Sequence, residues 1–306
     1  MKKTLTLAAV AATLLLTGCV REIYEQQASE YGENVPVGYL ATSLSWEQER
    51  DGGTAIQQLT NAVDGVGASF SKGYGTLREA ASDAIQLPVG EYDFISMANM
   101  TEADGYVLSG LPPTKAFERT GGIYVSLKDT SAPLEQSWFG VTGASVKQNV
   151  VTLAAPVLQR LLPSIMLHLS DVPAGTVMTI TLKGVAKRIL LTAKDANGHY
   201  GLPGEETMDL VLGTVTGDGD KEFLCLPTAS NQERSFLIFD VTSPSEPPFT
   251  CVCDVPAVSG GTDYKLDLDF HDIESYLYIT SQRINDWEEG WTISGEVLNP
   301  QESSKK

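Results

Sequence analysis

Short apolar and polar segments separated by turn residues dominate the pattern along this chain. From residue 35 onward, runs rich in Val, Ile, Leu, Thr, Tyr and Phe lie between clusters of Gly, Pro, Asp and Ser, which is typical of β-strands joined by turns. Strands at this spacing predict antiparallel β-sandwiches rather than a parallel sheet with crossover helices. The predicted strands are 35–46, 90–98, 122–127, 137–147, 150–154, 164–170, 176–182, 189–193, 208–216, 222–226, 235–242, 262–270 and 276–282.

One segment near the end of this series alternates most regularly. Tyr264, Leu266, Leu268 and Phe270 are apolar, and the residues between them are charged. Successive side chains of a strand point to opposite faces of its sheet. The segment therefore predicts a strand with one buried face and one face in water, as in an antiparallel sheet at a domain surface.

Helical periodicity is scarce in the chain. Residues 77–85 predict one short helix, which ends before the turn 87–90. The glycine-rich stretch Gly65–Gly75 and the segment Asp51–Gly53 are predicted to be loops. A phosphate-binding loop is disfavoured at 65–75, because neither a Gly-Lys-Ser/Thr sequence nor a long helix follows.

The first nineteen residues have the pattern of a bacterial lipoprotein signal peptide. A basic start, Met1-Lys2-Lys3, precedes an uncharged, mostly apolar stretch, Thr4–Thr17. This stretch is shorter than the roughly 20 residues that a membrane span needs. Leu16-Thr17-Gly18-Cys19 fits a lipobox, so we expect cleavage before Cys19 and lipid attachment to its thiol. The alternative is an ordinary secretory peptide with a chance cysteine.

The remaining length is enough for two domains with their own cores. Residues 20–34 are polar and acidic without a sustained period, which favours a tether between the lipidated cysteine and the folded body. The predicted organisation is a signal peptide at 1–18, a lipidated tether at 19–34, β-sandwich domains at 35–149 and 150–300, and a polar tail at 301–306.

The charge of the chain disfavours nucleic-acid binding. Removal of Lys2 and Lys3 with the signal peptide takes the formal net charge from −18 to −20, and this field repels phosphate. The densest basic group, Lys183, Lys187 and Arg188, lies in a strand-like segment. These three residues are predicted to be solvated at the ends of strands.

Three cysteines follow Cys19, namely Cys225, Cys251 and Cys253. An exported protein can form disulfides, but an odd count leaves one thiol over. Cys251 and Cys253 would share a strand face and would compete for Cys225 more readily than pair together. A metal site is the alternative, but three cysteines without a neighbouring histidine make a poor one.

The histidines match no catalytic triad or metal signature. His168, His199 and His271 have unrelated settings and are predicted to be structural. Alternation places Asp267, Asp269 and His271 on one strand face, where a divalent cation could sit. A solvated acidic face is the favoured alternative, because antiparallel sheets routinely expose one polar side.

The remaining motifs form no catalytic centre. Gly217–Glu222 resembles an acidic calcium loop but lacks the EF-hand spacing and distal glutamate, so it is predicted to be a turn between strands. The sequence has no Gly-x-Ser-x-Gly elbow. We therefore expect a protein that is not an enzyme and has no cofactor or metal.

Two tryptophans near the C-terminus are candidate ligand-stacking residues. Trp287 and Trp291 flank Glu288-Glu289-Gly290, and exposed aromatic rings at such a position would stack on sugars. Packing in a core or at a sheet edge is the commoner fate of large aromatic side chains.

Several segments of the mature chain match the pattern of a known family. They are Cys19–Glu25 after the lipobox, Leu44-Ser45-Trp46 at the end of the first strand, Leu87–Ile95, Val150–Leu153 with Pro163–Leu169, and Arg283–Trp287. In these segments the chain resembles the fimbrillin-like lipoproteins of Bacteroidales and, within them, the anchor or accessory subunits of type V pili.

The resemblance implies two tandem β-sandwich domains of transthyretin-like, Greek-key type. It also implies assembly in which one subunit donates a strand to a groove in the next, where an unpaired sheet edge accepts it. Stalk subunits of the family carry a protease site ahead of the first strand. Arg21 and Arg50 do not lie between a removable strand and the body, which favours an anchor or a stand-alone surface protein.

The sequence therefore predicts a lipid-anchored, surface-exposed protein of the outer membrane. Its expected partners are the membrane, through acyl chains on Cys19, and pilin-like subunits. The alternative function is that of a surface lipoprotein that binds carbohydrate or a host ligand.

Overall fold

β-Strands make up nearly all the regular structure of this protein. The computed structural model describes residues 31, 34–48, 51, 56–65, 68–112, 121–130, 132–196, 198–244, 246–270, 282–285 and 290–293. Within these residues the sheets are mostly antiparallel. The predicted all-β class is therefore confirmed.

The described residues contain one short helix, α2 (Leu77–Ser82). It starts where the sequence predicts, because the Thr76 side chain accepts a hydrogen bond from the Glu79 backbone N–H at 3.2 Å and caps the first turn. The Glu79 carboxylate in turn accepts from the Gly75 N–H at 2.9 Å. The helix ends at Ser82, three residues before its predicted end.

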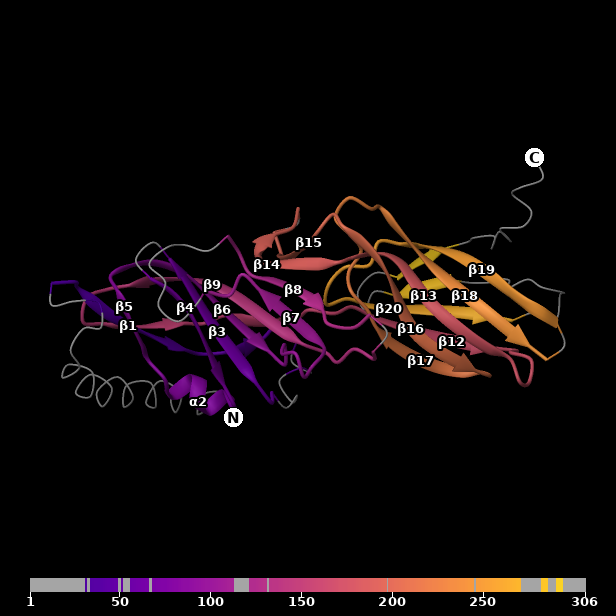
Figure 1. Ribbon diagram of the computed structural model, residues 1–306, viewed down its shortest axis with the longest axis horizontal. Helices are drawn as coiled ribbons and strands as arrows, with labels where there is room; N and C mark the ends of the chain where they lie inside the picture. The colour runs from indigo at the N-terminus through magenta and orange to yellow at the C-terminus, as the bar shows by residue number, and fades with distance from the viewer. Residues whose placement is uncertain are drawn as a thin grey trace, which may run out of the picture. The chain divides into compact units, whose positions relative to one another are not determined.

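The chain divides into two compact units (Figure 1). The N-terminal unit comprises Met1–Ser96, Leu111–Gly121 and Gly140–Leu158, and the C-terminal unit comprises Met97–Gly110, Gly122–Phe139 and Gln159–Lys306. Each unit is assembled from several segments of the chain. The domain boundaries predicted from sequence stay predictions.

The N-terminal unit holds a three-stranded sheet and most of a six-stranded sheet. The three-stranded sheet has the order β10 (Val151–Ala154), β1 (Val37–Thr42), β5 (Ile85–Pro88). The order of the six-stranded sheet is β2 (Ser45–Trp46), β11 (Val157–Arg160), β9 (Trp138–Val146), β6 (Gly90–Ala98), β3 (Leu59–Gly65), β4 (Ser69–Tyr74). Its core cluster contains Leu40, Val63, Ala68, Leu87, Tyr92, Phe94, Ala144, Val146 and Ala154.

The prediction of a loop at Gly65–Gly75 is wrong. This stretch contains strand β4, which pairs antiparallel with β3 from Leu59↔Tyr74 to Asp64↔Ser69. β4 lies at the edge of its sheet and is half exposed, so glycine and serine are tolerated there and weaken the strand signal in the sequence. The Ser69 hydroxyl donates to the Asp64 carboxylate at 2.6 Å and holds the turn of this hairpin.

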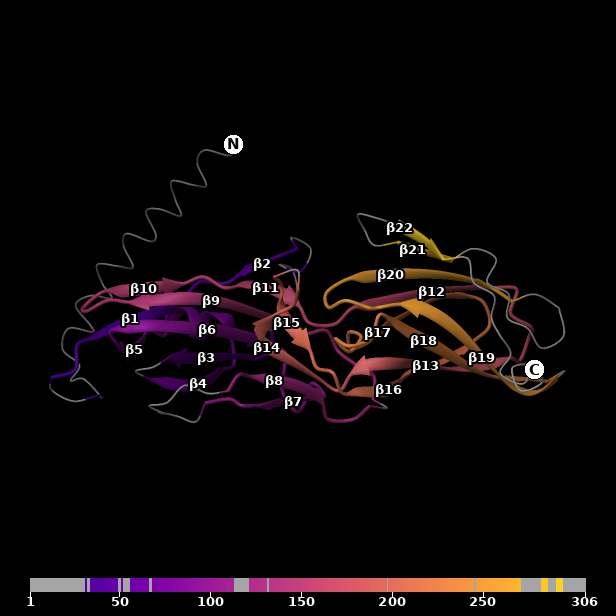
Figure 2. The same cartoon turned by 90° about the horizontal axis from the view of Figure 1, so that it is seen from above.

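The C-terminal unit holds three larger sheets and a hairpin (Figure 2). A three-stranded sheet has the order β17 (Gly219–Leu224), β12 (Ser164–Ser170), β20 (Asp263–Asp269). One four-stranded sheet has the order β16 (Thr207–Thr216), β13 (Val177–Ala186), β18 (Arg234–Ser243), β19 (Glu246–Pro256), and the other has the order β15 (Tyr200–Pro203), β14 (Arg188–Lys194), β8 (Tyr124–Leu127), β7 (Tyr106–Ser109). The hairpin consists of β21 (Gln282–Asn285) and β22 (Gly290–Ile293). The β12–β20 pair is parallel, and the other pairs are antiparallel.

Alternate residues of the first two sheets form the core of the C-terminal unit. The predicted alternation in β20 is confirmed, because Tyr264, Leu266 and Leu268 are buried and Lys265 is exposed. The same period appears on the other strands of these sheets. Their buried residues include Ile165, Leu167 and Leu169 on β12, Met178, Ile180 and Leu182 on β13, and Leu237, Phe239 and Val241 on β18.

Candidate functional site

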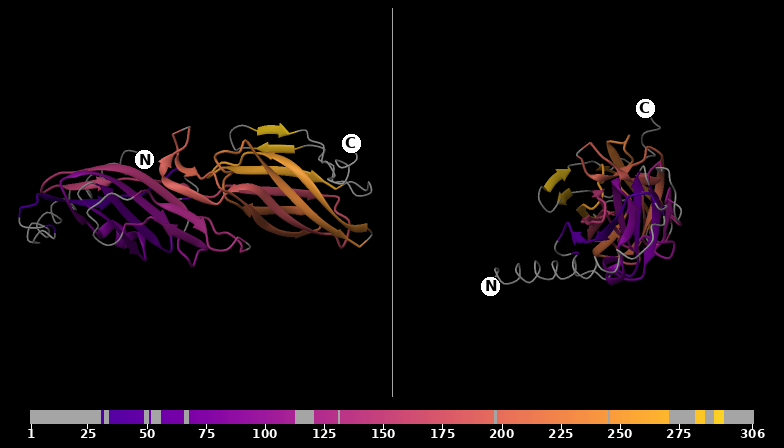
Figure 3. Two further views of the ribbon diagram at one scale, coloured as in Figure 1. Left: turned by 45° about the horizontal axis from the view of Figure 1, so that its top comes forward. Right: turned by 90° about the vertical axis from the view of Figure 1, so that its left-hand side faces the viewer.

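Two strands of the C-terminal unit end their sheets in the described strand order. β19 ends the four-stranded sheet, where it pairs antiparallel with β18, and β20 ends the three-stranded sheet, where it pairs parallel with β12. The hairpin β21–β22 also contacts β20 and is drawn in yellow beside it in Figures 2 and 3. Strands at sheet edges present backbone N–H and C=O groups that can pair with another chain. Because the β21–β22 hairpin lies along β20, another chain could pair with β20 only by displacing this hairpin.

A small apolar recess lies between these two strands, with a cavity volume of about 20 Å³. Both sheets contribute to its walls, so the recess opens into the sandwich core. Side chains pack without gaps in most protein interiors, and a void loses the contacts that a filling side chain would make. We call this feature the β19–β20 recess. It is lined by Ile165, Leu237, Val255, Pro256, Val258, Tyr264 and Leu266.

β19 has the composition of an edge strand without charge protection. Pro247, Pro248 and Pro256 lie within it, and proline is confined to edges because it cannot donate to a sheet ladder. Residues 247–253 carry no charge, although charged side chains commonly prevent unwanted pairing at edges. These prolines also explain why the sequence pattern did not predict β19. Proline also blunts pairing at an edge because it has no N–H, so within β19 the uncharged, proline-free stretch Phe249–Cys253 is the suitable template for another strand.

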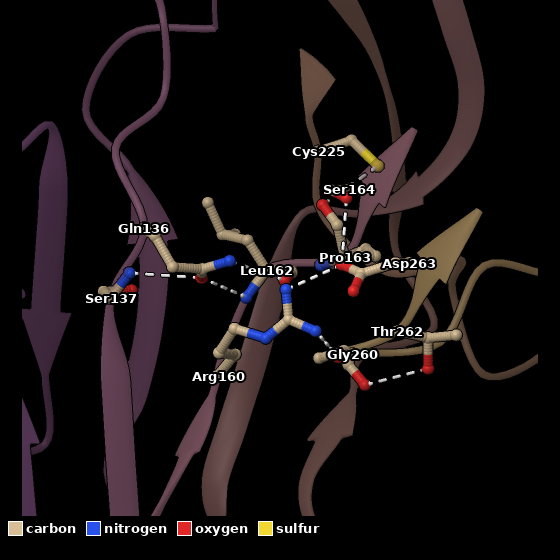
Figure 4. Close-up of polar contacts among 11 residues, drawn as sticks. Gln136, Ser137, Arg160, Leu162, Pro163, Ser164, Cys225, Gly260, Thr262 and Asp263 are labelled. Carbon is tan, nitrogen blue, oxygen red and sulfur yellow. Dashed lines mark hydrogen bonds and ion pairs between the residues drawn. The ribbon is translucent and has the colours of Figure 1, made fainter. Parts of the chain in front are cut away.

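Three side chains place β20 against β12 (Figure 4). The Arg160 guanidinium donates to the Asp263 carboxylate at 2.7 Å, and the Ser164 hydroxyl donates to the same oxygen at 2.9 Å. The ion pair is nearly buried, with side-chain exposures of 8% for Arg160 and 13% for Asp263. Both sequence neighbours of this network, Ile165 and Tyr264, stand opposite each other in the β12–β20 register and line the recess.

Arg160 also holds the turn that leads into β20. Its second terminal nitrogen donates to the Gly261 carbonyl at 2.6 Å. Gly261 has a φ of +70°, and a Cβ at this position would lie 3.0 Å from the Arg160 carbonyl oxygen. Glycine is therefore required both by the backbone conformation and by the close approach of the two chain segments.

Gln136 supports the segment that joins β11 to β12. Its side-chain oxygen accepts from the Leu162 N–H and the Ser137 N–H, both at 3.2 Å, and its nitrogen donates to the Leu162 carbonyl at 3.1 Å. Figure 4 shows this amide beside Arg160. The entry into β12 is thus fixed independently of the ion pair.

Tyr264 keeps the wall of the recess neutral. Its phenol oxygen accepts a hydrogen bond from the Ser259 N–H at 2.8 Å, and burial raises its pKa. Cys225 lies close by, and its buried thiol donates to the Pro163 carbonyl at 3.9 Å. Burial also raises the pKa of the Cys225 thiol, so it is not a reactive nucleophile. Cys251 and Cys253 are likewise buried.

Of the acidic face considered as a cation site, the structure describes the side chain of Asp267, whereas Asp269 and His271 lie outside the described side chains. His168 stands in register with Asp220 on one side and Asp267 on the other, and its Nδ1 lies 2.6 Å from an Asp220 carboxylate oxygen. Lys265 Nζ lies 3.7 Å from Asp267 Oδ1. Across the described residues, no group of three or more His, Cys, Asp or Glu side chains is placed to hold a metal ion.

The turn predicted over Gly217–Glu222 joins β16 to β17 but is shorter than predicted, because β17 already begins at Gly219. The Asp218 carboxylate accepts from the Val172 N–H at 2.7 Å, so its role is to fix two neighbouring turns of the C-terminal unit.

Several candidate residues lie outside the described residues, namely Cys19, Trp287 and His271. Trp291 lies in β22 opposite Ile284. Lipid attachment to Cys19 and ligand stacking by Trp287 and Trp291 stay predictions. In the part of the chain that the structure describes, no helix is long and apolar enough to span a membrane.

No protein-family model and no curated protein sequence matches the chain. Its fold is similar to those of several solved structures. A candidate polysaccharide-binding protein from Bacteroides thetaiotaomicron has a TM-score of 0.57 and 12% identity over 85% of this chain and 98% of its own. A candidate adhesin from Bacteroides ovatus has a TM-score of 0.55 and 10% identity, over 86% of this chain and 97% of the adhesin.

The third similar structure is the fimbrial anchor protein Mfa2 from Porphyromonas gingivalis. Its TM-score is 0.50, with 14% identity over 84% of this chain and 99% of that protein. At these identities the comparisons show a shared fold. The resemblance predicted from the sequence is confirmed at this level.

Arg160→Ala should lower the free energy of unfolding by about 3–5 kcal/mol, because it leaves the nearly buried Asp263 carboxylate without its main cation. Lys187→Ala is the matched control: Lys187 pairs with Glu206 at 3.4 Å, and both side chains are more than 60% exposed. Its loss should cost less than about 1 kcal/mol. Urea unfolding measures both variants. Equal losses of unfolding free energy in the two variants would contradict the prediction that the Arg160–Asp263 pair matters more for stability than an exposed pair.

Proposed function

We propose that this chain is a lipid-anchored cell-surface subunit of a fimbria-like assembly, in an anchor or accessory position, and that it contacts pilin-like subunits by strand addition. The observation that carries the proposal is the β19–β20 recess, an apolar space flanked by two strands at sheet edges. In strand addition, main-chain hydrogen bonds supply affinity and pockets for alternate side chains supply specificity. The recess and its edges offer both.

The chemistry of the recess defines the strand that would fit. A strand paired with β19 would point every second side chain toward the core, where apolar side chains would pack against the apolar walls of the recess. Charged side chains at those positions would lose hydration without gaining a partner. The partner segment should therefore alternate apolar and polar residues, as pilin strands do when they complete another subunit's sandwich.

Two further features support a surface location and the absence of a catalytic role. The lipobox ending at Cys19 would supply acyl chains, and two or more chains anchor a protein stably where one is marginal. The similar solved structures include a fimbrial anchor and a candidate adhesin. Together with the buried, unreactive Cys225, these features favour the role of an outer-membrane anchor or adhesion protein over that of an enzyme.

Filling the recess tests the strand-addition function. Val255→Phe should place a larger apolar side chain in the space a donated strand would use, and should reduce surface-attached filaments at least about ten-fold, the effect of losing ~1.4 kcal/mol of contact. Val211→Phe is the control, because Val211 is 42% exposed on β16. Immunogold electron microscopy counts the filaments. Normal filament attachment by a folded Val255→Phe protein at native surface levels would contradict the proposal.

The lipid anchor has its own test. Cys19→Ala removes the acceptor thiol, so the protein should move from the membrane fraction to the soluble exported fraction. Immunoblotting of fractionated cells measures the distribution. Continued membrane retention of the variant would show that Cys19 is not the attachment point.

A second candidate function, carbohydrate binding, is favoured by one face of the sheet that contains β14. The Arg188 guanidinium lies 4.9 Å from the centre of the Tyr124 ring, and Lys194 Nζ lies 4.7 Å from that of Tyr200. Both cations are exposed, and both tyrosines are partly exposed. Aromatic rings beside cations can stack on sugar rings and attract acidic groups. The candidate polysaccharide-binding protein of similar fold supports this alternative.

A glycan array distinguishes the two functions. If carbohydrate binding is the function, the protein should bind acidic polysaccharides, and Tyr124→Ala or Tyr200→Ala should weaken binding roughly ten-fold, the loss of about one stacking contact. Trp287→Ala and Trp291→Ala test the ligand-stacking role predicted for these two tryptophans. No binding to any acidic or neutral glycan would exclude this alternative.

A further inference from the structure

Three exposed valines gather at one end of the N-terminal unit. Val35, Val89 and Val150 come from three separate segments, and their side chains are 37%, 44% and 46% exposed. Single exposed valines are common on protein surfaces, but apolar residues that gather from separate segments indicate a contact surface.

Backbone hydrogen bonds hold the three segments together at the start of β1. The Val89 N–H donates to the Pro36 carbonyl at 2.9 Å, and the Tyr39 N–H donates to the Val150 carbonyl at 3.0 Å. The Asn149 N–H donates to the Val37 carbonyl at 2.9 Å. β1 lies between β10 and β5 in the sheet order, and Figure 2 shows the three strands side by side. We call this end of the unit the valine tip.

The valine tip is poor in carboxylates. Its segments 34–39, 86–90 and 146–151 contain one charged residue, Lys147, which is exposed. The neighbouring Glu91 is also exposed, and its carboxylate accepts a hydrogen bond from the Ser145 hydroxyl at 2.6 Å. This composition stands out in a mature chain whose formal charge is −20 after removal of Lys2 and Lys3. Carboxylates would be costly to bring to a lipid interface, whereas a lysine can reach lipid phosphates while its stem lies among apolar groups.

The position of the tip in the chain points to the membrane as its partner. Val35 follows Cys19 by only 16 residues, a length that spans at most about 55 Å even when fully extended. A lipid on Cys19 would therefore keep the start of β1 within about 55 Å of the bilayer surface. Attachment to the same surface raises the local concentration of the tip, so a small apolar patch can bind there although it would not bind alone.

From these observations we propose that the valine tip contacts the headgroup and acyl boundary of the membrane to which Cys19 is attached. The proposal rests on lipid attachment at Cys19. Contact at the tip would give the N-terminal unit a defined orientation on the membrane, with β1, β5 and β10 starting or ending at the lipid surface.

Fluorescence quenching by brominated lipids tests the contact. The full-length lipidated protein, as Val89→Trp or Val150→Trp, is reconstituted in phosphatidylethanolamine and phosphatidylglycerol vesicles with or without lipids brominated near the headgroup. The added tryptophan should be quenched about two-fold, as expected for burial at the acyl boundary. Val211→Trp is the control, because Val211 has similar exposure (42%) but lies on β16 of the C-terminal unit.

Unsubstituted protein provides a second measurement. Lys147 and Lys221 are both exposed, so a water-soluble amine reagent should label both in detergent. In vesicles, labelling of Lys147 should slow several-fold, while Lys221 keeps its rate. Equal rates for Lys147 in the two conditions would overturn the membrane contact.

Flotation of the vesicles separates the possible failures. Protein that floats but shows no more quenching at residues 89 and 150 than at 211 overturns the contact at the tip and leaves lipid attachment intact. A blue shift without bromine quenching also overturns it, because a second protein copy would then cover the tip. Protein that does not float overturns lipid attachment and the tip contact together.

Discussion

Arg160 and Asp263 are separated by 103 residues in the chain, and their side chains meet at 2.7 Å in a nearly buried position. This ion pair sets the parallel register of β12 and β20, because Asp263 stands opposite Ser164 and shares its carboxylate oxygen with the Ser164 hydroxyl. The register places Ile165 opposite Tyr264 in the wall of the β19–β20 recess. Removal of one partner of such a pair is costly, because it leaves an uncompensated buried charge, even where the intact pair adds little net stability.

Local pattern in the sequence predicted β12, whose two faces differ in polarity, and also β6, whose residues Phe94–Ala98 are buried on both faces. β6 and β12 have the predicted bounds, and Tyr264, Leu266 and Leu268 are buried as their alternation requires. β19 was missed because its prolines suppress the strand signal, although an edge strand tolerates them. Local pattern also could not predict that β20 would pair parallel with β12, because the Arg160–Asp263 contact joins distant segments and has no local periodicity.

The candidate sites also include some features that the sequence reveals and others that only the structure shows. The alternation around Asp267 is visible in the sequence and places Lys265 on the same face, but only the structure shows that His168 of β12 lies beside Asp267. The apolar recess has no sequence motif, since its walls come from four strands and a connecting segment. The proposed contacts with a partner strand and with the membrane use different surfaces, the recess in the C-terminal unit and the valine tip in the N-terminal unit. An anchoring subunit would need both kinds of contact.

Amide hydrogen exchange along β19 and β20 tests strand addition most directly. The full chain is compared alone and in filament complexes isolated from the cell surface. Backbone amides at a sheet edge exchange quickly until a partner strand bonds to them. Strand addition predicts that amides of Glu246–Pro256 or Asp263–Asp269 exchange at least about ten-fold more slowly in the complex, as a new hydrogen-bonded ladder requires. Unchanged exchange in both strands, with slowing elsewhere in the chain, would contradict it.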